Sequence, residues 1–413
     1  MHNTIKPVSS WYKMNDFFLK YHNAGLKNVM FAMLFFISLL GYIPMLPYWL
    51  YNIGTFITIP IFIFITSNYS NRFVTKNEIA FLGLFVLSLL LSYLTSPFGF
   101  TIAGFLRALV PIIFYYLVRV LNVKKTDFYY SVLYYLLILS FLVAAYQFFF
   151  QPAYIINDDG AWEEVEGVLT LMKRPVSYLG NSNVFGVFTV FCFLILFTEG
   201  NQRLTKNQKV ALFIVTILNL TLFSKSRTSL AAFIVTLLIY LFHKRKFIPL
   251  LVVFLFFLAG IAYVLSNYEQ IEAIDNIFRL SSLSSEDRNS YSIRSEIAKF
   301  AIPLIGERPF FGVGVGNEQQ LMMSTGAPHK GMESATLLLL IERGILGYLI
   351  YLYILFSKFL LVKNNITRIL IGLVMISVDF TETVCVIPQL STFLAIYLGV
   401  TWNTVNQTDN KLL

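Results

Sequence analysis

Residues 267–334 read NYEQIEAIDNIFRLSSLSSEDRNSYSIRSEIAKFAIPLIGERPFFGVGVGNEQQLMMSTGAPHKGMES, the longest polar stretch in a chain that is otherwise almost entirely apolar. On both sides the sequence returns to apolar runs long enough to cross a bilayer. Loops carry most functional sites, while helices supply the scaffold. We therefore expect a membrane protein built around one large loop, residues 267–334, which carries site residues.

The composition is typical of a polytopic membrane protein. Hydrophobic residues make up 57% of the 413 residues and charged residues only 13%. The net charge of +9 is better explained by basic cytoplasmic loops than by nucleic-acid binding. Cys192 and Cys385 both lie in apolar runs, so they predict neither a disulfide framework nor a metal site.

A membrane-spanning helix needs ~20 apolar residues, and this criterion gives about twelve spans. The predicted fold class is therefore all-α, with the large loop between the ninth and tenth helices. The spans lie near residues 29–46, 49–67, 78–96, 99–121, 127–150, 176–198, 208–224, 228–243, 247–266, 335–356, 366–384 and 387–402. They divide the chain into an N-terminal tail (1–28), helices 1–9 (29–266), the loop (267–334), helices 10–12 (335–402) and a C-terminal tail (403–413).

The loops between these spans alternate in charge. If the N-terminus is cytoplasmic, the outside loops near Pro47, Pro97 and Pro388 carry no charge, and the outside loop at 151–173 is acidic. Basic residues favour the cytoplasmic side, so the pattern predicts two cytoplasmic termini and an extracytoplasmic large loop. The basic residues of the inside loops are Arg72, Lys76, Arg119, Lys124, Lys125, Arg203, Lys206, Lys209, Lys244, Arg245, Lys246, Lys358, Lys363 and Arg368.

Several charged residues lie inside predicted spans, where a charge is costly unless it is paired or hydrated. Arg107 is in the fourth span, Glu342 and Arg343 are in the tenth, and Asp379 and Glu382 are in the eleventh. For the three acidic residues we favour structural pairing between helices. Arg107 suits a structural role or a phosphate-binding role equally well, because an arginine facing a cavity is a good phosphate partner.

Three outside elements hold the other candidate residues. The first, RPVSYLGNSN (174–183), includes Arg174 and Asn183 and is also typical of a turn with a helix cap. The second, SKSRTS (224–229), is a short hairpin that includes Arg227 and is basic although it lies outside. The third is the large loop, with Arg294, Gly312, Gly314, His329 and Glu333.

The glycine run of the large loop does not predict a nucleotide site, because no strand–turn–helix unit surrounds it. His329, a single loop histidine, is more often incidental than catalytic. Together, however, several arginines and a candidate base on one membrane face suit an anionic, lipid-linked substrate. Arginine binds phosphate oxygens through two parallel bonds, and a carboxylate or imidazole can take a proton from an attacking hydroxyl.

These elements, in this order, resemble the Wzy/O-antigen ligase superfamily of bacterial membrane glycosyltransferases. The resemblance covers most of the chain and rests on loose motifs in a specific order. One position departs from the family pattern. Family members often have His-Asn about eleven residues before the glycine that matches Gly344; this spacing comes from the resemblance and not from periodicity. Here Glu333-Ser334 occupies that position and His329 lies four residues earlier. The identity of the general base stays open, and the departure favours a polymerase over a ligase. The matching segments are 174–183, 226–229, Arg294, 307–314 and 333–347.

The resemblance implies an enzyme of the bacterial cytoplasmic (inner) membrane that polymerises undecaprenyl-pyrophosphate-linked oligosaccharide repeat units into O-antigen or capsular polysaccharide on the extracytoplasmic face. It implies that Arg227, Arg294 and Arg174 stabilise the pyrophosphate leaving group, with no metal or other cofactor, and it makes a chain-length regulator protein a candidate partner. A glycan ligase of the same superfamily and a lipid-linked oligosaccharide transporter or flippase are the alternatives.

Overall fold

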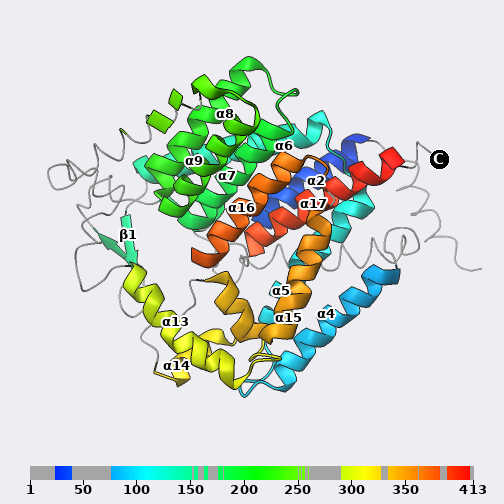
Figure 1. The fold of residues 1–413 in the computed structure, drawn as a ribbon, viewed down its shortest axis with the longest axis vertical. Coiled ribbons are helices and arrows are strands. Elements are labelled where there is room, and N and C mark those ends of the chain that lie inside the picture. Colours follow the sequence, from blue (N-terminus) through cyan, green and yellow to red (C-terminus); the bar gives the residue numbers. More distant parts are fainter. Residues whose placement is uncertain are drawn as a thin grey trace, which may run out of the picture.

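The structure is a computed structural model, and it describes residues 24–39, 76–150, 153–156, 162–165, 175–179, 181–249, 251–252, 254–255, 259, 290–326, 334–360, 362–381 and 388–409. The described chain is helical, as predicted, apart from one short hairpin (Figure 1). In this hairpin β1 (Ala153–Ile156) pairs antiparallel with β2 (Trp162–Val165), and it lies within the predicted acidic outside loop.

Most of the described helices overlap predicted spans. The described helices are α2 (Ala24–Leu39), α4 (Lys76–Leu94), α5 (Ile102–Leu121), α6 (Asp127–Phe150), α7 (Ser182–Thr198), α8 (Lys206–Leu218), α9 (Arg227–His243), α13 (Ser290–Glu307), α14 (Glu318–Ser324), α15 (Ala335–Phe359), α16 (Asn365–Thr381) and α17 (Pro388–Asp409). Of these, α13 and α14 lie in the predicted large loop, and α17 extends beyond the predicted span end at 402. A π-helical turn, Asn219–Ser224, continues α8. The predicted span 49–67 and most of 247–266 lie outside the described residues. Within the predicted large loop, residues 290–326 include two helices, α13 and α14.

Three helices of the described chain are long and apolar enough to cross a membrane: α6, α8 together with its π-helical turn, and α15. Shorter apolar helices occur at Asn28–Leu39, Leu82–Leu94, Ser182–Thr198 and Arg227–His243. These helices fit a membrane protein, while the count of twelve spans stays a prediction.

The largest hydrophobic core joins α2, α6, α7, α8, α9, α16 and α17 to one face of α5. Phe393 of α17 lies near its centre, with ring centroids 5.4 Å from Phe188 and 6.1 Å from Phe191, both of α7. In Figure 1, α7, α8 and α9 run side by side in the upper half, and α4, α13, α14 and α15 form the lower half. Candidate residues lie in both halves, and α5 and α17 connect the two halves.

Charged side chains gather at the helix ends that the loop pattern predicts to be inside. Glu78 of α4 accepts hydrogen bonds from Arg119 of α5 (2.7 Å) and from Lys358 of α15. Lys125, after α5, lies 2.8 Å from Glu199 at the end of α7. These helix ends lie close together, as expected for helices that cross the membrane in alternating directions. The side of the membrane on which they lie stays a prediction.

Candidate functional site

Helix α15 is interrupted at Gly344, whose backbone has φ 63° and ψ −176°. The break releases main-chain groups that have no helical partner, and in a membrane such groups must be satisfied within the protein. Residues 308–316 lie against the break and satisfy them. Four hydrogen bonds join the two segments: Val313 N–H to Ile341 O (2.9 Å), Gly314 N–H to Glu342 O (2.9 Å), Ile345 N–H to Pro309 O (2.7 Å) and Leu346 N–H to Phe310 O (3.3 Å). We call residues 308–316 and 341–346 the loop–helix junction.

The glycine run of the large loop is explained by this junction. Gly312, Gly314 and Gly316 have φ values of 68°, 87° and 87°, a region that glycine adopts without strain. A Cβ atom on Gly312 would also overlap the carbonyl oxygen of Ile341. The run is therefore a packing element that lets the loop approach α15.

The turn between α4 and α5 fixes the other side of the same loop. The Asn317 side-chain amide donates to Gly99 O at 3.0 Å and to Val313 O at 2.9 Å. The hydroxyls of Tyr93 and Thr101 both donate to Val315 O, at 2.7 and 2.8 Å. Loop 308–317 is therefore bonded to the end of α4, to the turn between α4 and α5, and to the break in α15.

Beneath the junction, Arg107 of α5 forms an ion pair with Glu342 of α15. The same carboxylate oxygen accepts the Gly316 N–H at 2.7 Å. Glu342 has no exposed side-chain surface, whereas the Arg107 side chain is 34% exposed. The pairing between helices that the sequence favours for Glu342 is thus present, and its partner is Arg107.

Arg343, next in α15, places a second cation beside this pair. It is buried, and its guanidinium carbon lies 5.4 Å from the ring centre of Phe85 and 5.7 Å from that of Tyr351. Two guanidinium groups, Arg107 and Arg343, and two carboxylates, Glu342 and Glu318, interact electrostatically here. The two guanidinium groups are the groups of this cluster that suit an anionic ligand.

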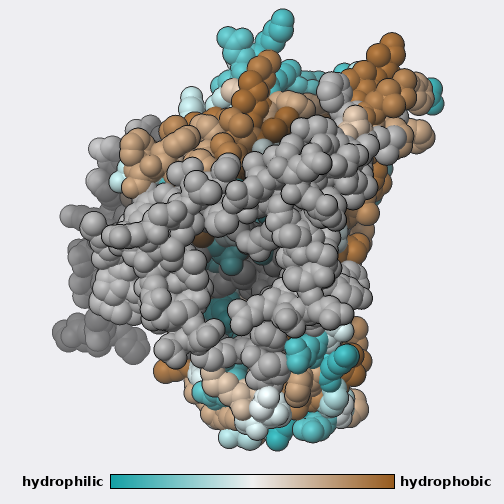
Figure 2. Space-filling model, turned by 90° about the vertical axis from the view of Figure 1, so that its left-hand side faces the viewer, coloured by the Kyte–Doolittle hydropathy of each residue, from teal (hydrophilic) through white to brown (hydrophobic). Residues whose placement is uncertain are grey.

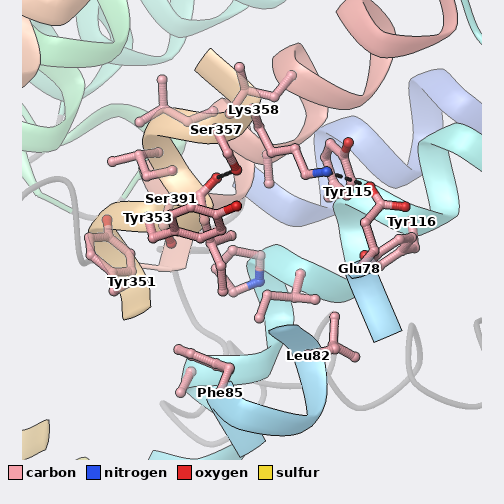
Figure 3. Close-up of a pocket in the computed structure, with 18 of the residues that line it drawn as sticks. Glu78, Leu82, Phe85, Tyr115, Tyr116, Tyr351, Tyr353, Ser357, Lys358 and Ser391 are labelled. Atoms are coloured by element: carbon pink, nitrogen blue, oxygen red, sulfur yellow. Dashed lines mark hydrogen bonds and ion pairs between the residues drawn. The ribbon is translucent and has the colours of Figure 1, made fainter. Parts of the chain in front are cut away.

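Arg107 and Arg343 also line a cavity of about 380 Å³ between α4, α5, α15 and α17. It extends toward the ends of α4 and α15 where Lys358 faces Glu78, beside Tyr115 and Tyr116 of α5 (Figure 3). Figure 2 turns the left-hand side of Figure 1 toward the viewer, and hydrophobic residues cover much of the described surface in its upper half.

The turn that carries Arg227 lies in the upper half, between the π-helical turn and α9. Lys225 is buried and has a left-handed backbone (φ 48°) that ends the π-helical turn. Ser226 caps α9 by accepting the Ser229 N–H at 3.4 Å. A Cβ on Gly186 of α7 would lie 2.6 Å from Ser229 Oγ. Arg227, half-buried, is therefore held at the start of α9 and close to the N-terminal part of α7.

Segment 175–183 shows the turn and helix cap that its sequence also predicts. Gln147 of α6 accepts the N–H groups of Val176 (3.1 Å) and Ser177 (2.8 Å). Asn181 caps α7 by accepting the N–H groups of Asn183 (2.8 Å) and of the next residue. Sequence reasoning missed Gln147, although a lone glutamine in an apolar run is a usable signal.

The structure thus brings the predicted residues together in two groups. Arg107, Gly312 and Gly314 belong to the junction and the cavity beneath it, while Asn183 and Arg227 lie at the start of α7 and α9. The backbone of Arg294 is in α13, which packs against α15 through Ile297, Ala301 and Leu304. Arg174, His329, Glu333 and Glu382 lie outside the described residues.

A family model described as O-antigen ligase (Wzy_C) matches residues 212–352. No match to a curated protein was found. The matched range includes the Arg227 turn, α13, α14, the loop–helix junction and most of α15. Over these residues the chain is similar to the O-antigen ligase family.

Proposed function

We propose that this protein is a membrane glycosyltransferase that polymerises undecaprenyl-pyrophosphate-linked oligosaccharide repeat units into O-antigen or capsular polysaccharide. The observation that carries the proposal is the match over residues 212–352, because it covers Arg227, Arg294 and the loop–helix junction in one domain. It supports a lipid-linked glycan as the substrate class. The extracytoplasmic face of a bacterial inner membrane is the proposed place of the reaction.

In the proposed reaction a hydroxyl of the non-reducing sugar on one carrier attacks the anomeric carbon of a glycan on another carrier. A new glycosidic C–O bond forms, and the bond from the anomeric carbon to the pyrophosphate breaks. The hydroxyl proton passes to a base, and the lipid pyrophosphate leaves with the electron pair. Charge therefore builds up on the leaving pyrophosphate, where fixed cations lower the barrier most.

Arg227 is the residue we assign first to this leaving group, with Arg294 and Arg174 as further ligands. It is the first residue of α9, where the helix dipole adds to the positive potential. Ser226 and the contact between Gly186 and Ser229 hold this helix start in place. A fixed guanidinium at a helix start needs little reorganisation when the charge develops.

Glu333 and His329 are the proposed candidates for the base. Glu333 directly precedes Ser334, which caps α15 by accepting the Leu337 N–H at 3.5 Å. The Ser334 hydroxyl also donates to Asp379 O of α16 at 3.3 Å. The residue after Glu333 is therefore fixed between two helices, which favours Glu333 as a positioned base.

A ligase is the second candidate, because the matching family model is described as an O-antigen ligase. The replacement of the usual His-Asn by Glu333-Ser334 favours the polymerase instead. Purified protein in liposomes, supplied with undecaprenyl-pyrophosphate-linked repeat units alone, separates the two. A polymerase produces a ladder of glycans that differ by one repeat unit. A ligase produces no ladder and transfers glycan only when a different acceptor is added. A transporter forms no new glycosidic bond in either case, and this outcome would overturn the proposal.

A further inference from the structure

The cavity between α4, α5, α15 and α17 is long, and much of its wall is apolar. Arg343 and Lys358 line its two ends on α15, and the uninterrupted helix from Ile345 to Lys358 alone is roughly 20 Å long. That length is a large part of the ~30 Å hydrocarbon core of a bilayer. The apolar side chains along it include Leu82, Ile112, Ile354, Leu394 and Leu398. Such a cavity suits a hydrocarbon chain.

The end of the cavity near the loop–helix junction carries a buried cation, Arg343, with one unsatisfied nitrogen. Arg343 is only 5% exposed, and within the described chain its Nε has no acceptor. A buried polar group without a partner is costly, and a buried cation more so. Arg107 beside it is partly exposed and forms an ion pair with Glu342. An anionic group at this end would satisfy Arg343 and would lie at the top of the apolar cavity.

We infer that this cavity holds the isoprenoid chain of a second lipid carrier, with its pyrophosphate at Arg107 and Arg343. This inference rests on the proposed function, because a polymerase must hold two carriers at once. Arg227 lies in a different part of the protein, at the start of α9, and is left to bind the first carrier.

The charges also assign the two carriers different roles. The donor loses its pyrophosphate, so the cations around it must stabilise charge that develops in the transition state. The acceptor keeps its pyrophosphate intact and needs binding alone. Glu342 already neutralises part of the charge at Arg107. A site of reduced positive charge is adequate to bind a pyrophosphate that stays intact. The cavity is therefore the acceptor's site.

The test counts bound undecaprenyl phosphate per purified chain by native mass spectrometry and measures its affinity. Ala395 lines the cavity, and Ala395→Phe fills part of it from α17, while Ile354→Trp fills it from α15. Ala80 of α4 is exposed, so Ala80→Phe is the matched control. The cavity-filling variants are expected to bind one lipid fewer than the wild type, and the control the same number. Arg343→Gln is expected to weaken this lipid about tenfold to a hundredfold, the loss of one charged hydrogen bond.

Unchanged lipid counts in both folded cavity-filling variants would overturn the inference. The inference would also be overturned if phosphatidylglycerol displaced undecaprenyl phosphate from the cavity as well as undecaprenyl phosphate itself does, since the site would then accept any anionic lipid. Thermal melting checks that each variant is folded, and the two variants fill the cavity from different helices. If the wild type forms a ladder of products but the cavity-filling variants bind as many lipids as the wild type, only the assignment of the cavity is wrong. If the cavity-filling variants bind one lipid fewer but the wild type forms no ladder, the proposed function is wrong instead.

Discussion

The main chain of Phe310 lies directly against Gly344, at the point where α15 is interrupted. A Cβ atom on Gly344 would overlap the Phe310 carbonyl, and the Leu346 N–H donates to that carbonyl at 3.3 Å. The loop thus takes the place of part of the helix's own hydrogen bonding. Because this junction holds the large loop on α15, it sets the position of the segments that lead to the candidate base.

Gly344→Ala is expected to destabilise the protein strongly. The backbone angles at Gly344 belong to a region adopted almost only by glycine, and forcing another residue there costs ~1–3 kcal/mol before any overlap with Phe310. Thermal melting in detergent measures the effect. The control is Gly83→Ala on α4, where a Cβ atom meets nothing within 4 Å, so its melting temperature is expected to stay equal or to rise. Equal melting of the two variants would show that the junction is not needed for stability.

Arg107→Met is expected to destabilise the lipid-free protein, because it removes the guanidinium that is hydrogen-bonded to the buried Glu342 carboxylate. Breaking a fully buried pair costs ~3–5 kcal/mol; the partial exposure of Arg107 lowers this to about 1–3 kcal/mol. Adding Glu342→Gln removes the unpaired charge, while its amide oxygen still accepts the Gly316 N–H, so most of the stability returns. A double-mutant cycle on melting free energies checks the coupling. Additive losses would mean that the ion pair contributes no stability of its own.

The sequence predicts the elements of this fold better than the contacts between them. The span at 127–150 coincides with α6, and the hairpin containing Arg227 is bounded by helices as expected. The break at Gly344 is not predictable, because one glycine in an apolar run costs a helix only ~1 kcal/mol. The fit of Gly312 against Ile341 depends on a contact between segments far apart in sequence. Pairing of Glu342 was predictable from the cost of a buried charge, but its partner Arg107 was not.

Reporter fusions test the topology that the basic loops predict. Fusions at Ser284, in the large loop, and at Lys125, between α5 and α6, are expected to report opposite sides of the membrane, with Lys125 cytoplasmic. A fusion at Lys246 provides a second inside position. If the reporters at Ser284 and Lys125 lie on the same side, the arrangement of twelve spans is wrong.

Arg227→Ala is expected to abolish polymer while protein level and single repeat units stay normal. Arg227→Lys is expected to fail as well, because a point charge cannot reproduce the two parallel hydrogen bonds of a guanidinium. Arg203→Ala is the control: Arg203 is 53% exposed and pairs with Asp127 at the opposite end of α7. Glycan ladders on gels measure the outcome. Full activity of Arg227→Lys would show that the two parallel hydrogen bonds of the guanidinium are not needed. Full activity of Arg227→Ala would show that Arg227 does not belong to the site.

The identity of the base is tested by His329→Ala and Glu333→Gln, each assayed for chain extension at matched protein level. The two residues are four positions apart, a spacing that would place them on one face of a helix. Glu333 holds the family's position for the base, so we expect Glu333→Gln to have the larger effect. A general base contributes ~10²–10⁴-fold to the rate, so its loss shortens or abolishes the polymer without unfolding the protein. The pH dependence separates the candidates: a histidine base loses activity as the pH falls through ~6.5, whereas a carboxylate base keeps it down to ~4.3. Normal polymer length and rate in both variants would exclude both residues and direct the search to Glu296, Glu307 and Glu318 of α13 and α14.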